Sequence, residues 1–233
     1  IYWDKDVERA AMLEKCGVRV FNKSAVIELC DDKNKTFLYL SGKNIPMPET
    51  ITSPLLYPAF DDTDGLFADS VEKRLGYPMV VKEAYGSFGA QVYLAKNRSE
   101  LDALRNRLKY MPHLYQRYVK NSSGEDIRII VVGGKAVAAM KRKNNGDFRA
   151  NIELGGVGEK YIPSSEQVEL SERICRLLGA DYIGVDLLFD KDKTLLCEVN
   201  TNAHFMFISD CTGVDVAKLY VGHVMEEIYG RAD

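Results

Sequence analysis

The sequence predicts an α+β protein, and two observations lead to this class. Apolar runs of strand length alternate with amphipathic segments of helical length along the whole chain. Most of the apolar runs are joined by short turns, such as Gly133-Gly134, and not by the long helical crossovers that parallel strands need. The pattern therefore favours α+β over a doubly wound parallel sheet.

Composition and charge narrow the class of protein. The 233 residues suffice for one large domain or two small ones, and 46% hydrophobic with 28% charged residues is ordinary for a globular chain. The formal net charge of -3 argues against nucleic-acid binding, which needs a basic surplus. No apolar run could span a bilayer, so we expect no membrane partner. The five cysteines are dispersed without a CxxC pair, which predicts reduced thiols and a cytoplasmic protein.

The N-terminal segment is predicted to be the end of an α/β unit too small to fold alone. Residues 4–15 have helical periodicity and are stopped by Gly17. Residues 18–21 are expected to form a short strand, and Ser24 to cap a short helix. Because the chain opens at Ile1 without an initiator methionine, we expect the rest of this unit to lie outside the sequence.

The remaining elements follow from periodicity, turn residues and caps. Helices are expected at residues 32–41, 67–75, 99–108 (with Ser99 and Asp102 as a capping box), 164–178 and 215–228. Strands are expected at residues 79–82, 92–95, 114–119, 127–132 and 136–141. Residues 45–48 should be extended, 58–65 a loop or linker, and 155–158 a flexible glycine stretch.

A further β-hairpin is predicted where two apolar runs, residues 182–189 and 194–200, flank a short charged segment. Asp186 interrupts the first run, and Glu198 and Asn200 interrupt the second, where they share one face of the strand. An even-length loop would send Asp186 to the other face, whereas an odd loop such as residues 191–193 places it opposite Glu198. We expect the odd loop, because three converging oxygen ligands make a magnesium site. The alternative is a partly solvated sheet face with scattered acids.

A glycine-rich segment follows the predicted strand that ends at Lys82. Its sequence, Tyr-Gly-Ser-Phe-Gly-Ala at residues 85–90, would let backbone amides approach an anion, with the lysine as a charge for phosphate. It lacks the Gly-Lys-Ser/Thr of a Walker A loop and leads into a strand, so we expect a flap over phosphates, mobile without nucleotide. A plain hairpin is the alternative. Lys33 could hold the same phosphate, or belong to a solvated helix end.

The strand at residues 114–119 and the segment after it could bind a nucleoside. Backbone groups of residues 115–119 could bind an adenine, and Glu125 or Asp126 could accept the ribose hydroxyls. Arg128 suits phosphate oxygens, and positive charge gathers at residues 141–143 and at Arg149. A solvated basic turn is the alternative for this last cluster.

Taken in order, these pieces resemble the ATP-grasp ligases, and within them the RimK-like branch of the ribosomal-protein glutamate ligase. They cover almost the whole chain from Phe21 onward: Asp32-Lys33 with Thr36, residues 77–82, Gly86 and Gly89, residues 115–119, residues 124–128, Asp147-Phe-Arg-Ala-Asn151 with Gly155-Gly156, Gly184-Val-Asp186, and Glu198-Val-Asn200. Two departures stand out. Arg117 lies where this branch has an acid, and Thr-Asn-Ala-His-Phe at residues 201–205 replaces an Ala-Ser-Pro-Gly-type turn near the acceptor site.

The resemblance implies a role for each site residue. Nucleotide contacts would come from Lys33, Lys82, Asp126 and Lys141, from the loop Gly86, Ser87, Phe88 and Gly89, and from the backbone of Gln116, Arg117, Tyr118 and Val119. Arg128, Arg149 and Asn151 would line the phosphoryl-transfer and acyl site. Asp186, Glu198 and Asn200 would hold Mg²⁺, as two ions bridged by Glu198, with Mn²⁺ as a substitute.

It also implies a domain division and an activity. Residues 1–22 would be the remnant of an N-terminal α/β domain, and residues 23–233 an ATP-grasp domain with a flap subdomain at 67–118 and a metal and acceptor subdomain at 119–233. The activity would be ATP-dependent amide formation through an acyl phosphate, joining glutamate or another amino acid to a peptide or small carboxylate. A nucleotide-binding regulatory module without catalysis and a D-alanine ligase-like enzyme are the alternatives, and a homo-oligomer is compatible with all three.

Overall fold

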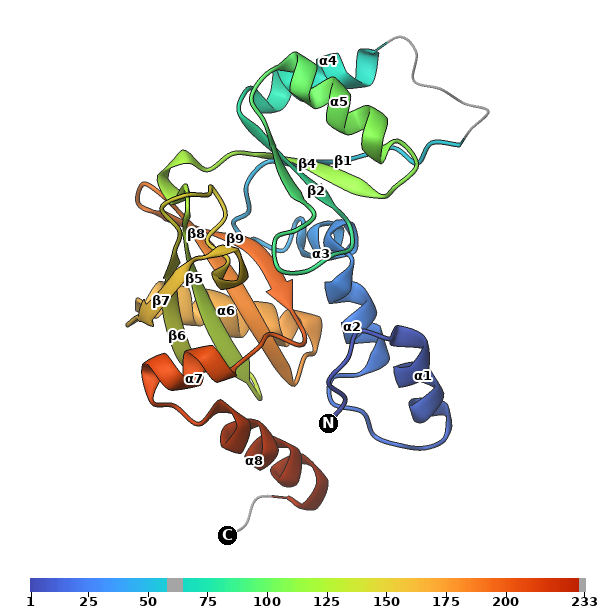
Figure 1. The fold of residues 1–233 in the computed structure, drawn as a ribbon. Helices are drawn as coiled ribbons and strands as arrows, with labels where there is room; N and C mark the ends of the chain where they lie inside the picture. Colours follow the sequence, from blue (N-terminus) through green and yellow to red (C-terminus); the bar gives the residue numbers. More distant parts are fainter. Residues whose placement is uncertain (58–64, 231–233) are drawn as a thin grey trace.

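Helices and antiparallel sheets make up the structure, a computed structural model that describes residues 1–57 and 65–230 (Figure 1). The helices are α1 (Val7–Lys15), α2 (Ser24–Asp31), α3 (Lys33–Leu40), α4 (Leu66–Leu75), α5 (Arg98–Leu108), α6 (Ser165–Leu178), α7 (Met206–Thr212) and α8 (Val216–Tyr229), with short 3-10 helices at Lys120–Ser122 and Ile152–Leu154. The strands are β1 (Thr50–Thr52), β2 (Met79–Glu83), β3 (Val92–Ala95), β4 (His113–Arg117), β5 (Glu125–Val132), β6 (Lys135–Lys143), β7 (Val157–Lys160), β8 (Tyr182–Asp190) and β9 (Lys193–Asn200). The predicted α+β class is confirmed, and no described helix is long and apolar enough to cross a membrane.

The smaller sheet has four antiparallel strands in the order β1-β4-β2-β3. Helices α4 and α5 cover one of its faces, where Val71, Leu101 and Tyr115 are fully buried (Figure 1). Strand β1 was not predicted from the sequence. Because β1 pairs with β4, this sheet begins before residue 67, the predicted start of the flap subdomain. The predicted loop at residues 58–64 lies outside the described residues.

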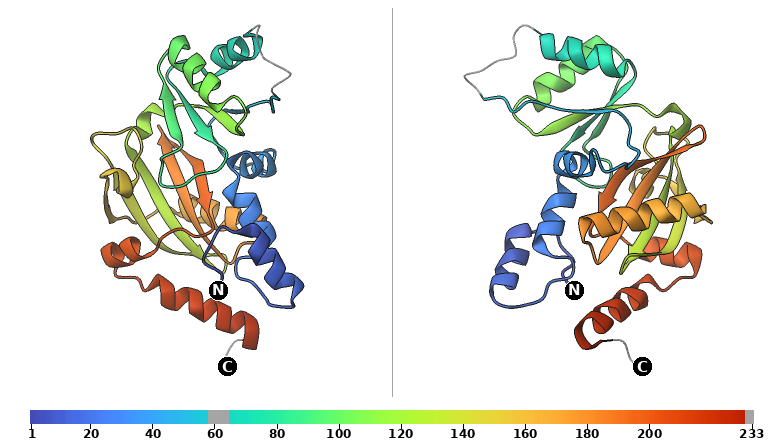
Figure 2. Two further views of the ribbon diagram at one scale, coloured as in Figure 1. Left: turned by 45° about the vertical axis from the view of Figure 1, so that its right-hand side comes forward. Right: turned by 180° about the vertical axis from the view of Figure 1, so that it is seen from behind.

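The larger sheet has five antiparallel strands in the order β7-β6-β5-β8-β9. Helix α6 crosses one face, and Ile127 and Val185 pack there in the main core (Figure 2). On the opposite face, α7 and α8 cover the end that carries Ile130 and Tyr182. The rest of that face, including Asp186, is turned toward the smaller sheet.

Residues 18–21 form no strand, so this prediction is wrong. Val20 packs between α1 and α2, and Phe21 is buried against the larger sheet. The Asn22 side chain fixes the segment: its Nδ2 donates to the Tyr182 carbonyl at 2.6 Å, and its Oδ1 accepts from the Asp181 N–H at 2.7 Å. The apolar residues that suggested a strand are therefore core contacts of an irregular segment.

Three local predictions need correction. Ser24 does not cap α2: it is the first residue of that helix, and its hydroxyl donates to the Glu14 carboxylate at 2.5 Å. Asn97 rather than Ser99 caps α5, since its side chain accepts a backbone N–H of the first turn. The glycine stretch at residues 155–158 was expected to be flexible, but it leads into the edge strand β7, which pairs with β6.

The hairpin of β8 and β9 places Asp186 opposite Glu198, as predicted, but the reason is different. Asp190 pairs with Lys193, so the loop between them has an even number of residues. Cys197 is an extra residue in β9, a β-bulge that shifts the register by one. The bulge turns the end of β9 so that its polar side chains share the face of Asp186.

Candidate active site

A cavity of about 680 Å³ lies between the two sheets. Its walls come from both of them: Val80, Lys82, Gln116, Arg117, Tyr118 and Val119 from the smaller sheet and the segment after it, and Asp126, Arg142, Asp186, Leu188, Cys197 and Glu198 from the larger one. A hollow of about 310 Å³ shares Gly89, Asn151, Asp186 and Glu198 with this cavity and adds Lys33, Arg128, Asn200 and the loop at residues 86–88. Every predicted site residue except Lys141 lines one of the two.

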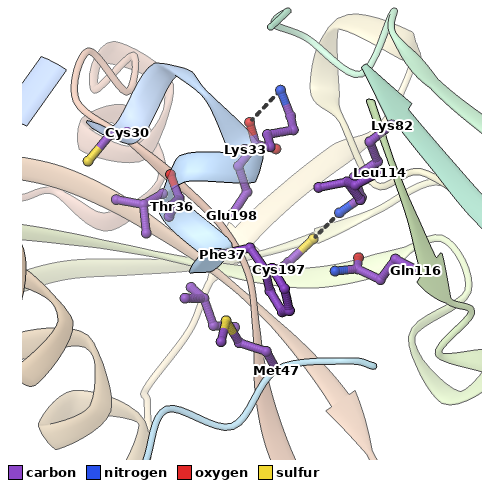
Figure 3. Close-up of a pocket in the computed structure, with 12 residues that line it drawn as sticks. Cys30, Lys33, Thr36, Phe37, Met47, Lys82, Leu114, Gln116, Cys197 and Glu198 are labelled. Atoms are coloured by element: carbon purple, nitrogen blue, oxygen red, sulfur yellow. Dashed lines mark hydrogen bonds and ion pairs between the residues drawn. The ribbon is translucent and has the colours of Figure 1, made fainter. Parts of the chain in front are cut away.

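A third pocket, of about 430 Å³, adjoins the cavity where α3 meets β2, β4 and β9 (Figure 3). It shares Lys82, Gln116, Cys197 and Glu198 with the cavity, and otherwise its walls are mostly apolar. The Sγ atom of Cys197 lies 3.6 Å from the Nζ atom of Lys82, and burial raises the pKa of this thiol to about 11. The thiol is therefore a neutral neighbour of the lysine at neutral pH.

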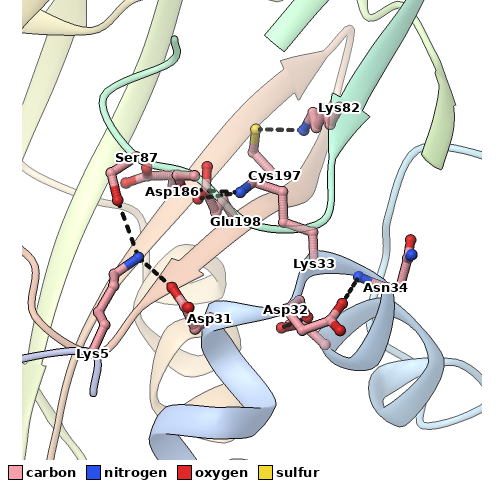
Figure 4. A network of polar contacts seen from close by, with 12 residues as sticks. Lys5, Asp31, Asp32, Lys33, Asn34, Lys82, Ser87, Asp186, Cys197 and Glu198 are labelled. Atoms are coloured by element: carbon pink, nitrogen blue, oxygen red, sulfur yellow. Dashed lines mark hydrogen bonds and ion pairs between the residues drawn. The ribbon is translucent and has the colours of Figure 1, made fainter. Parts of the chain in front are cut away.

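Two lysines reach the site from different parts of the chain (Figure 4). Asp32 caps α3 and so fixes its first residue, Lys33, whose Nζ donates to the Gly86 carbonyl at 3.2 Å and lies 3.6 Å from Glu198. Lys82 is buried near the end of β2. Both ammonium groups thus face the carboxylate end of the cavity, with the glycine loop beside them.

The glycine loop has little room for larger residues. At Gly89 the backbone φ is +74°, and an added Cβ would lie 2.7 Å from the Asn151 Oδ1. Arg149 holds the same end of the loop, because its Nη1 donates to the Gly89 carbonyl at 2.6 Å. Arg149 is itself oriented by two hydrogen bonds to Asp147, and these hydrogen bonds lower the pKa of that carboxyl.

The predicted metal ligands lie together on the open face of the larger sheet. Asp186 and Glu198 are register partners, and Asn200 pairs with Gly184 two positions along. Among the described residues, no three His, Cys, Asp or Glu side chains are grouped as a metal site, so the third oxygen would be the Asn200 amide. Two carboxylates and one amide fit a hard cation such as Mg²⁺.

Arg142 lies at the centre of a buried chain of charges, although the sequence marks it only as part of a basic segment. It donates to both Asp126 oxygens at 2.6 Å, and its Nη2 lies 3.0 Å from Asp186. Arg128 donates to both Asp186 oxygens at 2.7 Å. Burial alone raises the pKa of Asp186, but the charges of Arg128 and Arg142 outweigh it and hold the pKa below its ordinary value. The Gly133-Gly134 turn alone would set Lys141 opposite Asp126, but Val137 is an extra residue in β6, a β-bulge that shifts the register by one and brings Arg142 there instead.

Lys141 lies on the other face of the larger sheet. It pairs with Ile127 in the register, and its Nζ contacts Glu125 at 2.7 Å. The prediction that it contacts the nucleotide is therefore withdrawn. Arg117 lines the cavity, but its guanidinium points outward to Glu49 and donates to the Arg74 carbonyl at 3.0 Å.

Two sheets that enclose a cavity, with a glycine loop and lysines on one side and carboxylates on the other, define an ATP-grasp protein. The fold of an ATP-grasp RimK domain protein from Sphaerobacter thermophilus agrees, with a TM-score of 0.74 at 23% identity over 94% of this chain and 77% of that one.

The chain belongs to the RimK-like ATP-grasp family, because the profile of the RimK-like ATP-grasp domain matches residues 30–224. It is 33% identical to human N-acetylaspartylglutamate synthase A and 34% identical to β-citrylglutamate synthase B of Danio rerio, over 98% of its own length in both cases. It spans 58% and 56% of those two proteins. The predicted family and fold are thus confirmed.

Proposed function

We propose that this chain carries the ATP site of a carboxylate–amine ligase. The observation that supports this most is that the cavity and the hollow beside it together gather Lys82, Arg128, Asp186, Glu198 and Asn200. At the other end of the cavity are the backbone and side chains of residues 116–119, where an adenine would lie. Such an arrangement suits phosphoryl transfer, which depends mainly on positioning and on neutralising charge.

In the proposed reaction, a substrate carboxylate attacks the γ-phosphate of ATP, and ADP leaves. The amine nitrogen then attacks the acyl carbon of the acyl phosphate, inorganic phosphate leaves with a proton released from the amine, and the amide forms. Lys33 and Lys82 would exchange their contacts with Gly86 and Cys197 for phosphate oxygens. Arg128 would stabilise the charge of the transferred group.

Asp186, Glu198 and Asn200 would hold Mg²⁺, as two ions in our proposal or Mn²⁺ in its place. The metal would supply charge neutralisation at the phosphates. Because both Asp186 oxygens are already bonded to Arg128, a cation bound there would compete with this guanidinium. Glu198 forms a longer ion pair, 3.6 Å from Lys33, so it can bind a cation more easily than Asp186 can.

The names of both curated relatives contain glutamate, so we propose glutamate as the amine substrate. The second substrate would be a small carboxylate or a peptide with an accessible carboxyl group. Arg149 and Asn151 lie beside the glycine loop and would contact this carboxylate. The cationic Arg149 matches an acidic substrate.

The test is ADP release by the full-length protein with MgATP, across amino acids combined with small carboxylates and acidic peptides. We expect release that requires glutamate and one carboxylate together. Glu198→Gln removes one proposed metal ligand and is the inactive control. It should lower turnover about 10²-fold or more while the protein stays folded. ATP binding without ADP release for any pair would favour a regulatory module, and absence of nucleotide binding would refute the proposal.

A further inference from the structure

The N-terminal segment contacts the glycine loop from outside the cavity (Figure 4). The Nζ atom of Lys5 lies 2.6 Å from an Asp31 carboxylate oxygen and donates to the Ser87 hydroxyl at 3.2 Å. Lys5 precedes α1, Asp31 ends α2, and Ser87 is in the middle of the loop. Three segments of the chain thus meet at one ammonium group.

The backbone that presents Lys5 is held on both sides. Before it, the Trp3 ring packs against Tyr182 with 5.1 Å between ring centroids and against Phe205 with 5.3 Å. After it, the Asp6 side chain accepts from the backbone N–H of Arg9 and caps α1. The lysine side chain is also only 23% exposed. Its contact with the loop is therefore made from a fixed position and not from a free tail.

Lys5 differs from Lys33 and Arg149, which also contact the loop. Lys33 donates to the Gly86 carbonyl and Arg149 to the Gly89 carbonyl, and both would be needed by the ligands in the proposed reaction. Lys5 lies outside the cavity lining, and Asp31 neutralises it. It can therefore keep its contact with Ser87 while the other two cations change partners.

We propose that Lys5 is a positioning residue that holds the glycine loop in its place beside Lys33 and Asn151 through the Ser87 hydroxyl. The inference rests on the proposed function only for its effect on ATP; the effect on the loop is independent of it. Without Lys5, a smaller fraction of molecules would have the loop in the competent conformation, and apparent nucleotide affinity falls in proportion to that fraction.

The first test is hydrogen exchange of the loop in the full-length protein without nucleotide. The amide of Ala90, which donates to the Ser87 carbonyl, is the reporter. Lys5→Met should speed its exchange about threefold to tenfold, and Lys5→Arg should restore part of the protection. Lys35→Met is the matched control, because Lys35 forms a similar 2.6 Å ion pair with Glu28 in the same region. Unchanged exchange in Lys5→Met would overturn the proposal.

The second test is a double-mutant cycle on ATP kinetics with Lys5→Met and Ser87→Ala. Lys5→Met should raise KM for ATP about threefold to tenfold and change kcat less. In the Ser87→Ala background it should have little further effect, since the contact is already lost. Additive effects would show that Lys5 does not act through Ser87. If the wild type released no ADP with any substrate while Lys5→Met still loosened the loop, the proposed function would fail and the role of Lys5 would stand.

Discussion

Asp186→Asn separates two roles that the structure gives to one carboxylate. The side chain is a proposed metal ligand, and it also neutralises two arginines inside the protein. Asp186 is 4% exposed and Arg142 is 2% exposed, so removing the charge leaves the buried guanidinium of Arg142 and the partly buried one of Arg128 with Asp126 as their remaining close acid. Breaking a buried ion pair from one side costs about 3–5 kcal/mol. In a chain of this size that lowers Tm by roughly 6 to 20 °C.

Calorimetry without metal or nucleotide measures only the loss of stability caused by removing the Asp186 charge. Glu198→Gln is the control, because its described ion pair with Lys33 spans 3.6 Å and its side chain is 25% exposed. We expect it to change stability by no more than about 1 kcal/mol. Both variants should lose turnover, but Asp186→Asn alone should melt early. A Tm of Asp186→Asn within about two degrees of wild type would refute the assignment of a stabilising charge chain.

The Tm difference between wild type and Asp186→Asn should also change with pH in a defined direction. The pKa of Asp186 is below its ordinary value of 3.8, so the carboxylate stabilises the folded state fully above that value. This contribution is lost as the pH falls through the lower pKa of the folded protein. The Tm difference between wild type and Asp186→Asn should therefore be constant near neutral pH and shrink in acid. A difference that grows on acidification would contradict the reasoning.

Three further predictions follow from local geometry. Gly89→Ala should raise KM for ATP about tenfold with little change in Tm, because its Cβ would collide with Asn151 and the loop would have to move. Iodoacetamide should alkylate exposed Cys16 well before Cys197 at pH 8, as peptide mass spectrometry can show, since the pKa of Cys197 is raised to about 11; equal rates would be inconsistent with a buried thiol. Asn22→Ala should cost about 2 kcal/mol or more in urea unfolding, because it leaves buried backbone groups at the start of β8 unpaired; an unchanged midpoint would show that water replaces these bonds.

Much of the fold was predictable because local signals agreed with the final structure. Helices that end at glycine and strands that flank a Gly-Gly turn lie close to their predicted bounds. The three-residue strand β1 and the edge strand β7 were not predicted. Each depends on pairing with a distant strand, and short segments carry too little local pattern to reveal such pairing.

The residues that line the site were predicted better than the contacts between them. Residue types, their order and the family resemblance predicted that the lysines, glycines and carboxylates lie together, and they line the cavity and the hollow beside it. The sequence did not predict which face of β6 lines the cavity. Lys141 was assigned to the site, but Arg142 is the residue that faces Asp126. A one-residue difference in a strand reverses the face, so the assignment needed the register of the hairpin and not only its sequence.

The bulge at Cys197 determines where residues can be added to this hairpin or removed from it. Four register pairs, from Asp190 and Lys193 to Leu187 and Leu196, lie between the turn at residues 191–192 and the bulge, and they hold the pairing of the two carboxylates. An insertion at that tip would lengthen the far end of the hairpin and leave the site unchanged. Deletion of Cys197, by contrast, would shift the register of every residue beyond it by one position. The tip is thus a permissive place for a fluorophore or an affinity tag, about six strand residues (roughly 20 Å) from the chemistry.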